Sequence, residues 1–351
     1  MNGAGAPMVA PLASPEWLGY RPNNLGGNNM IARRALAASS AALLATPALA
    51  QPNWPNGPIR IIAPFPPGGS VDTVSRLLQQ PLSAELGVPV IVENRGGASG
   101  SLGTAQVARS APDGQSFVLV FDTHATNPAL IANMGFDTRR DLAPVLLLGT
   151  APNMLLTHRS RPWQNMGELV TAARARPDTI SYGTIGNGSL AHLGMVLAQR
   201  AGRVQLTHVP YRGGGPLAIS AMTGETDLVA ATGTIFVEHL RQGVLRPLAV
   251  MGPRRRPSLP DVPTMAEAGL PGVEAEAFWG ILAPAGTPPA ILARMEAATR
   301  RASEVPEVRE RLTTIMGIEM RNEGGAAFAA FLDRQIDIWG RVIRENEIKP
   351  D

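Results

Sequence analysis

The chain has 351 residues, 44% hydrophobic and 17% charged, with a formal net charge of +3, and this length favours two well-packed domains over extended disorder. It contains no cysteine, which excludes a disulfide framework, a thiolate metal site and a cysteine nucleophile. Lys349 is the only lysine, so neither a Schiff-base lysine nor a phosphate-loop lysine is available in the folded body.

The first fifty residues have the pattern of an export signal. Arg33 and Arg34 precede the apolar stretch 35–44, which is too short to span a bilayer well, and 48–50 reads Ala-Leu-Ala, a small-x-small cleavage pattern. We therefore expect residues 1–50 to be an N-terminal extension plus signal peptide, with translation starting at Met30 and cleavage after Ala50. A single Arg-Arg pair without a fuller motif favours the Sec route over Tat, and the expected destination is the periplasm.

Strand-like and helix-like runs alternate through the rest of the chain, which predicts an α/β fold built on parallel sheets. Strands are expected at 59–65, 88–93, 117–121, 145–157 (as two stretches divided by "GTAPN"), 180–183, 206–209, 228–231, 245–251 and 277–283. Helices are expected at 71–87, before 110, at 166–176, before 200 and 223, at 288–317 with a break near Val305-Pro306, and at 325–346.

Four glycine clusters lie where an expected strand gives way to an expected helix: "PPGGS", "GGASG", "TIGNGS" and "YRGGG". In parallel sheets ligands bind beyond the carboxyl ends of the strands, which is where these clusters lie. The free N–H groups of a helix N-terminus suit an anion. No Gly-Lys-Ser/Thr phosphate loop follows the glycines, so a carboxylate fits better than a phosphate. A purely structural role is equally open for any one cluster, since Ser189 is a good helix cap and Asp72 favours a helix start, but four in series favour a ligand.

Signatures of an enzyme are missing. The sequence has no G-x-S-x-G elbow, no H-E-x-x-H motif and no carboxylate pair at catalytic spacing. His124 and His192 lie near the expected cleft, where either could bind a ligand or serve the fold. We expect neither catalysis nor a cofactor or metal. The single dense basic run, 253–257, has few aromatic residues around it, so no nucleic-acid partner is expected.

Taken together, six segments resemble the Bug family, the extracytoplasmic solute receptors of tripartite tricarboxylate transporters. The resemblance covers residues 52–351, keeps the motifs in order, and rests on "APFPPGGSVDTVSRLL", "VIVENRGGASGSLGTAQVARSAPDGQSFVLV", "SYGTIGNGSLAHL", "HVPYRGGGPLAISAMTGETDLV", "RPLAVMGPRRRPSLPDVPTMAEAGLPG" and "FWGILAPAGTP".

The resemblance implies a two-lobed, type II Venus-flytrap fold of the periplasmic-binding-protein class, each lobe a mainly parallel sheet flanked by helices. From chain order we expect lobe 1 to comprise 51–155 and 275–351, and lobe 2 to comprise 156–274. The lobes would close on a small carboxylate and deliver it to membrane transporter subunits. The expected receptor is a monomer.

The resemblance also implies a set of ligand-binding residues, carried over by matching motif positions. In lobe 1 they are Phe65, Pro67, Gly68, Gly69, Ser70, Ala98, Ser99, Thr123 and His124. In lobe 2 they are Thr184, Gly186, Asn187, Gly188, Ser189, Tyr211, Arg212, Gly213 and Thr232. Many relatives carry an acidic residue where this chain has Ala231 and Thr232, which argues against an amino-acid ligand.

Two other interpretations are open at this point. A cleft enzyme acting on small carboxylates would need an activated nucleophile or an acid–base pair, and would turn its ligand over. A ligand sensor for a signalling partner would share the fold, and a neighbouring histidine-kinase gene rather than transporter genes would favour it.

Overall fold

The structure, a computed structural model, describes residues 54–349. The expected signal peptide, start at Met30 and cleavage after Ala50 lie outside the described residues. Within them the chain forms a ten-stranded sheet in the order β2-β1-β3-β9-β4-β7-β5-β6, with β8 and β10 also paired to β4. The strands are β1 (Ile59–Ala63), β2 (Val90–Asn94), β3 (Ser116–Val120), β4 (Leu142–His158), β5 (Ser181–Thr184), β6 (Thr207–Pro210), β7 (Leu228–Thr232), β8 (Leu245–Met251), β9 (Glu276–Pro284) and β10 (Glu319–Gly324).

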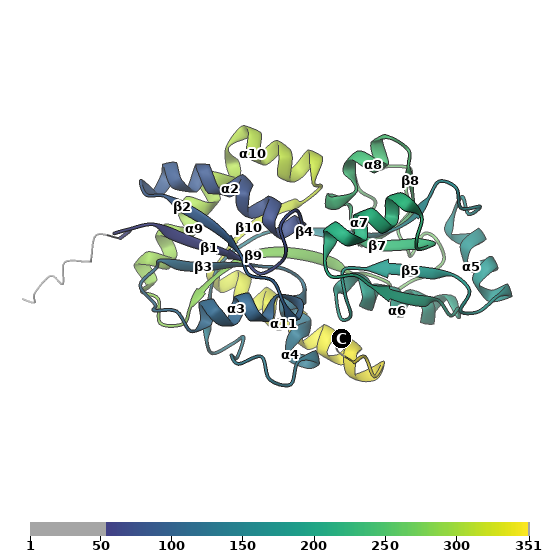
Figure 1. The fold of residues 1–351 in the computed structure, drawn as a ribbon, viewed down its shortest axis with the longest axis horizontal. Helices are drawn as coiled ribbons and strands as arrows, with labels where there is room; N and C mark the ends of the chain where they lie inside the picture. Colours follow the sequence, from purple (N-terminus) through teal and green to yellow (C-terminus); the bar gives the residue numbers. More distant parts are fainter. Residues whose placement is uncertain (1–53, 350–351) are drawn as a thin grey trace, which may run out of the picture. The chain divides into compact units, whose positions relative to one another are not determined.

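Helices cover both faces of the strands (Figure 1). They are α2 (Ser70–Leu86), α3 (Ser101–Ala108), α4 (Thr123–Leu130), α5 (Met166–Ala175), α6 (Leu190–Gly202), α7 (Gly214–Thr223), α8 (Val237–Arg241), α9 (Pro289–Glu304), α10 (Pro306–Glu310) and α11 (Gly325–Glu345). Short helical turns lie at Ala98–Gly100, Gly233–Ile235 and Arg311–Ile315.

The α/β class is confirmed, with two parallel groups of strands. One group consists of β1 with its neighbours β2 and β3, and the other of β5 with its neighbours β6 and β7. The sheet as a whole is mixed rather than mainly parallel, because β4 and β9 run antiparallel to the strands beside them.

The expected division of 145–157 into two stretches is wrong, because β4 is one strand of 17 residues. Its first part pairs with β9 and β10, and from Asn153 onward it pairs with β7 and β8. Pro152, which lacks an N–H, stands at this change of partners, where a missing donor interrupts neither ladder. The "GTAPN" segment is thus a crossover within a strand.

Two other differences concern segments with weak local signals. The edge strand β10 has the polar sequence "EMRNEG", and α4 has the sequence "THATNPAL", which is poor in strong helix formers. The expected break near Val305 is confirmed. Val305 has an extended backbone (φ −54°, ψ 127°) because Pro306 disfavours helical geometry in the residue before it.

The hydrophobic core lies on both faces of each parallel group. Ile61 and Ile62 are consecutive in β1 and belong to clusters on opposite faces, packed by α2 and α9 on one side and by α11 on the other. Leu155 and Leu156 of β4 divide in the same way between a cluster containing α6 and one containing α7. Burial on both faces holds the carboxyl ends of the strands, and the loops that follow them, in fixed positions.

Candidate ligand-binding site

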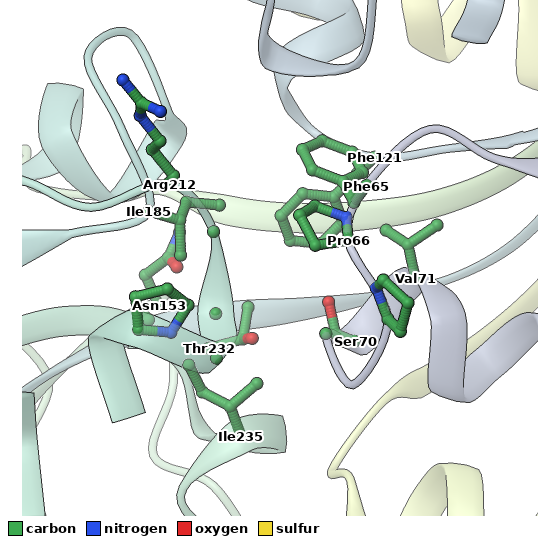
Figure 2. A pocket seen from close by; sticks show the side chains of 17 residues that line it. Phe65, Pro66, Ser70, Val71, Phe121, Asn153, Ile185, Arg212, Thr232 and Ile235 are labelled. Carbon is green, nitrogen blue, oxygen red and sulfur yellow. The ribbon is translucent and has the colours of Figure 1, made fainter. Parts of the chain in front are cut away.

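A cavity lies where the loop before α2 faces the loop before α7. Figure 2 shows Phe65, Ser70 and Phe121 on one side of it, with Arg212 and Thr232 on the other. The full lining consists of Phe65, Pro66, Pro67, Gly69, Ser70, Val71, Phe121, Asn153, Ile185, Arg212, Gly213, Gly214, Gly215, Pro216, Ala231, Thr232 and Ile235. These residues come from both parallel groups of strands and from the crossover in β4.

The two glycine turns face each other at close range. A Cβ placed on Gly214 would lie 3.9 Å from Cα of Gly69, and one placed on Gly213 would lie 3.8 Å from Cδ of Pro66. Gly213 has φ 101°, a backbone geometry that favours glycine. Both N-cap residues, Gly69 and Gly213, are glycines and so have no side chain that could cap the helix. The first N–H groups of α2 and α7, with the positive ends of the helix dipoles, are therefore available to one anionic group between them.

The loop before α2 is held from behind by Asp72. Its carboxylate accepts hydrogen bonds from the Gly68 N–H (3.0 Å), Arg76 Nε (2.9 Å) and Asn94 Nδ2 (2.9 Å). Asn94 Nδ2 also donates to the Phe65 carbonyl at 3.1 Å. Asp72 thus positions the loop, and the Gly68 amide is already occupied, which agrees with the absence of Gly68 from the cavity lining.

Three polar residues line the cavity on the side of the second group of strands and of β4, and Figure 2 shows the Arg212 side chain directed away from the other labelled residues. Arg212 is exposed and forms no ion pair among the described residues. Asn153 is 2% exposed, and its Nδ2 donates to the Ala275 carbonyl at 3.0 Å. The hydroxyls of Thr232 and Thr234 share a hydrogen bond of 2.7 Å. No acidic side chain is among the described residues that line the cavity.

Most of the remaining wall is apolar. Phe65 and Phe121 meet edge to face, with ring centroids 6.1 Å apart, and Phe121 packs on the buried Trp279 at 5.1 Å. Ile185 and Ile235 face these rings from the other side of the cavity (Figure 2). This wall offers a ligand dispersion contacts and dry surface rather than hydrogen bonds.

Some predicted site residues meet at this cavity and others do not. Those that line it are Phe65, Pro67, Gly69, Ser70, Arg212, Gly213 and Thr232. Those outside its lining are Gly68, Ala98, Ser99, Thr123, His124, Thr184, Gly186, Asn187, Gly188, Ser189 and Tyr211. The contribution of this second set to ligand binding stays a prediction.

The side chains of several residues in the second set are engaged within the fold. Thr123 Oγ1 donates to the Ser99 carbonyl at 2.9 Å, and Tyr211 donates its hydroxyl to Ser220 Oγ at 2.6 Å. Burial lowers the pKa of His124 to about 4, so this histidine is neutral, and its ring stacks on Phe136 at 6.2 Å.

The polar side chains of the loop before α6 also form hydrogen bonds within the fold. Thr184 Oγ1 lies 2.8 Å from His208 Nε2 and 3.1 Å from the Gly186 carbonyl. Ser189 caps α6 by accepting the His192 N–H at 3.3 Å, as its position in the sequence indicates. The His192 and His208 rings stack at 4.1 Å, and burial, with the nearby His192, lowers the pKa of His208 to about 3.

Several lining residues were not among the predicted contacts: Val71, Phe121, Asn153, Ile185, Gly215, Pro216 and Ile235. Ile185 and Gly215 belong to predicted glycine clusters, and Val71 and Pro216 directly follow one, so the clusters were the available signal for these four. Asn153 carried no such signal, because the segment around it was interpreted as a break between strands.

Asp122 is a second unpredicted feature, buried beside the α6 N-terminus. It is 0% exposed, and neither carboxylate oxygen accepts a hydrogen bond within the described residues. Burial raises its pKa to about 7, opposed by the nearby N–H groups of Thr123 and Leu190, which lie outside hydrogen-bond geometry. Asp122 is not among the residues that line the cavity.

Two kinds of feature are absent from residues 54–349. No group of three or more histidine, aspartate or glutamate side chains in this range is arranged to hold a metal ion. None of the helices there combines the length and the apolar character needed to cross a bilayer.

The α/β architecture and a cavity between glycine turns at helix N-termini are features of a protein that binds a small solute. The sequence profile described as tripartite tricarboxylate transporter family receptor matches residues 74–348. The chain belongs to this family of receptors.

Individual relatives agree with this assignment. Protein BugT of Bordetella pertussis is 32% identical over 317 residues, covering 87% of this chain and 95% of that protein. A structure of an R. palustris protein with adipate superposes with a TM-score of 0.81 at 31% identity, covering 85% of this chain and all of that one. The structure of MatC from Rhodopseudomonas palustris with bound malate superposes with a TM-score of 0.77 at 32% identity, covering 83% of this chain and 100% of that chain.

Proposed function

We propose that this chain is a periplasmic receptor that captures a small carboxylate in the cavity between α2 and α7 and delivers it to a tripartite membrane transporter. The observation that carries the proposal is the pair of facing glycine turns, Gly69 and Gly213, each beginning a helix without a side-chain cap. Such N-termini bind an anion through backbone N–H groups. The similar proteins solved with adipate and malate support a carboxylate as that anion.

The proposed mechanism is closure of two lobes, one comprising 51–155 and 275–351 and the other 156–274. The two connecting segments lie together, because both the N–H and Nδ2 of Asn153 donate to the Ala275 carbonyl. A ligand that contacts both lobes binds the closed form more tightly and shifts the population toward it. The closed form is then the one that docks on the transporter subunits, as a monomer.

The receptor is proposed to release its ligand unchanged. Lobe closure and anion capture need only backbone N–H groups and a dry wall, whereas acyl or proton transfer would need an activated group against the ligand. In the described part of the cavity, the polar side chains are Ser70, Asn153, Arg212 and Thr232, and no base lies beside Ser70 in the lining.

Isothermal titration of the purified protein with mono-, di- and tricarboxylates tests this function. At least one carboxylate should bind at micromolar concentration, and nuclear magnetic resonance after overnight incubation should recover it unaltered. The proposal would be contradicted if no carboxylate binds, or if the protein steadily converts a bound carboxylate into another compound.

A further inference from the structure

We infer that the ligand is a monocarboxylic acid with an apolar body and one hydroxyl group, rather than a diacid or an amino acid. This inference rests on the proposed function, and it assigns a substrate class to the same cavity.

The anion-binding part of the cavity has room for one carboxylate. The turns at Gly69 and Gly214 approach to contact distance, so α2 and α7 direct their N-termini at a single location. Both dipoles then stabilise the same charge. A second carboxylate would find no separate α-helix terminus among the residues that line the cavity, where Thr232 begins only the three-residue turn Gly233–Ile235.

Arg212 does not offer an equivalent second subsite. It is the one cationic side chain in the described lining, and it is exposed at the cavity edge. An ion pair in contact with water gains little, because solvent screens both partners. A second carboxylate would instead have to leave water for a wall of phenylalanine, isoleucine and proline, which is unfavourable without strong partners.

The rest of the ligand is expected to be apolar. Phe65 and Phe121 form one wall, and Ile185 and Ile235 form the facing wall (Figure 2). Burying a hydrocarbon chain or ring between them is favourable in proportion to the area removed from water. A ligand ammonium is excluded by charge, because none of the described lining residues is acidic.

The side-chain oxygen of Asn153 can accept a hydrogen bond from the ligand. Asn153 is 2% exposed and lines the cavity, and its Nδ2 is fixed on the Ala275 carbonyl, so its amide cannot be turned round. No described residue donates a hydrogen bond to its Oδ1. A ligand in the cavity would cover this oxygen, and because buried polar atoms in proteins are normally paired, a ligand hydroxyl supplies the donor.

A matched set of six-carbon acids tests this class by isothermal titration of the purified protein. Hexanoate, adipate and 6-aminohexanoate have the same six-carbon chain with a carboxylate at C1, and adipate adds a second carboxylate and 6-aminohexanoate an ammonium at the other end. The acids 2-hydroxyhexanoate and 6-hydroxyhexanoate add a hydroxyl group instead. We expect one hydroxy acid to bind tightest, about tenfold tighter than hexanoate, in keeping with one added hydrogen bond. Adipate and 6-aminohexanoate should bind at least tenfold more weakly than hexanoate.

The variant Asn153→Leu should abolish the advantage of the hydroxy acid over hexanoate, while Asn56→Leu, at an exposed asparagine, should preserve it. Adipate or 6-aminohexanoate binding as tightly as the hydroxy acids would overturn the inference and leave the receptor function standing. If no carboxylate of any class binds, the proposed function itself fails.

Discussion

Asp122 is a buried carboxyl group that accepts no hydrogen bond from residues 54–349, and this affects how stability depends on pH. Its pKa in the folded protein is about 7, against 3.8 for an ordinary aspartate, so the folded state holds a proton that the unfolded state has lost between these values. Stability linked to Asp122 is therefore present at low pH and is lost as the pH rises toward 7. Buried neutral His124 and His208 act in the opposite sense, because they resist protonation as the pH falls.

The variant Asp122→Asn isolates the carboxyl group from the histidines. We expect it to raise the free energy of unfolding at pH 8 by about 4 kcal/mol, since each pKa unit corresponds to about 1.4 kcal/mol, and by less at pH 5. Urea denaturation at the two pH values measures this. Asp261→Asn, at an exposed carboxylate, is the control, and equal effects of Asp122→Asn at both pH values would contradict the burial argument.

Gly69 offers a direct test of the anion site at the residue scale. Its φ of −78° suits any residue, and an added Cβ would meet only the Pro66 carbonyl oxygen, at 3.6 Å. The variant Gly69→Val should therefore fold with little loss of stability but place a side chain in the cavity, weakening carboxylate binding at least 100-fold. Gly57→Val, with a single ordinary contact away from the cavity, should bind as the parent does. Unaltered affinity in Gly69→Val would refute the assignment of this loop.

Sequence reasoning reached residues of the cavity lining where chemistry and position coincide, and their role in ligand binding stays a prediction. Glycine clusters between a strand and a helix pointed to Gly69, Ser70 and Gly213, because only backbone geometry was needed to place them. Asn153 and Phe121 could not be found in this way. Their place in the cavity depends on the pairing of β4 and on the packing of β3, which are tertiary properties.

At the scale of elements, β4 is the strand on which the arrangement depends. It pairs with β9 and β10 before Asn153 and with β7 and β8 after it, so it belongs to both halves of the sheet. Local sequence predicted a break there, because Gly149 and Pro152 are weak strand residues. Long-range pairing overrode that preference. β10 escaped prediction for the related reason that a polar edge strand has no alternating apolar pattern.

The close approach of β4 and β10 explains Gly149. A Cβ at this position would lie 2.5 Å from the Glu319 carbonyl oxygen and 2.6 Å from Cγ2 of Ile318. We expect Gly149→Ala to destabilise the protein by about 1–3 kcal/mol, as overpacking does, with a lower midpoint in thermal unfolding. Gly215→Ala, where an added Cβ meets nothing within 4 Å, should show no such loss. Equal midpoints for the two variants would contradict the pairing of β4 with β10.

At the scale of the whole molecule, the sequence predicts an exported protein whose mature form begins after Ala50. N-terminal sequencing of the protein recovered from the periplasm of an expressing cell should read Gln-Pro-Asn-Trp, starting at Gln51. An N-terminus at Met1 or Met30, or recovery in the cytoplasmic fraction alone, would contradict the signal-peptide interpretation.

The fold class and the family could be predicted from the chain as a whole, because the order of strands, glycine turns and helices is encoded locally and repeats twice. Whether the two proposed lobes are open or closed could not be predicted, since the proposed closure would depend on the balance between ligand contacts and the connecting segments at Asn153 and Ala275.

The most direct measurement is a crystal structure of the protein grown with the tightest-binding acid from the six-carbon series. If the facing backbone amides bind the ligand, its carboxylate oxygens will lie within about 3 Å of backbone nitrogens at the start of both α2 and α7. A carboxylate bound elsewhere, with the turns at Gly69 and Gly213 apart and unoccupied, would contradict the account.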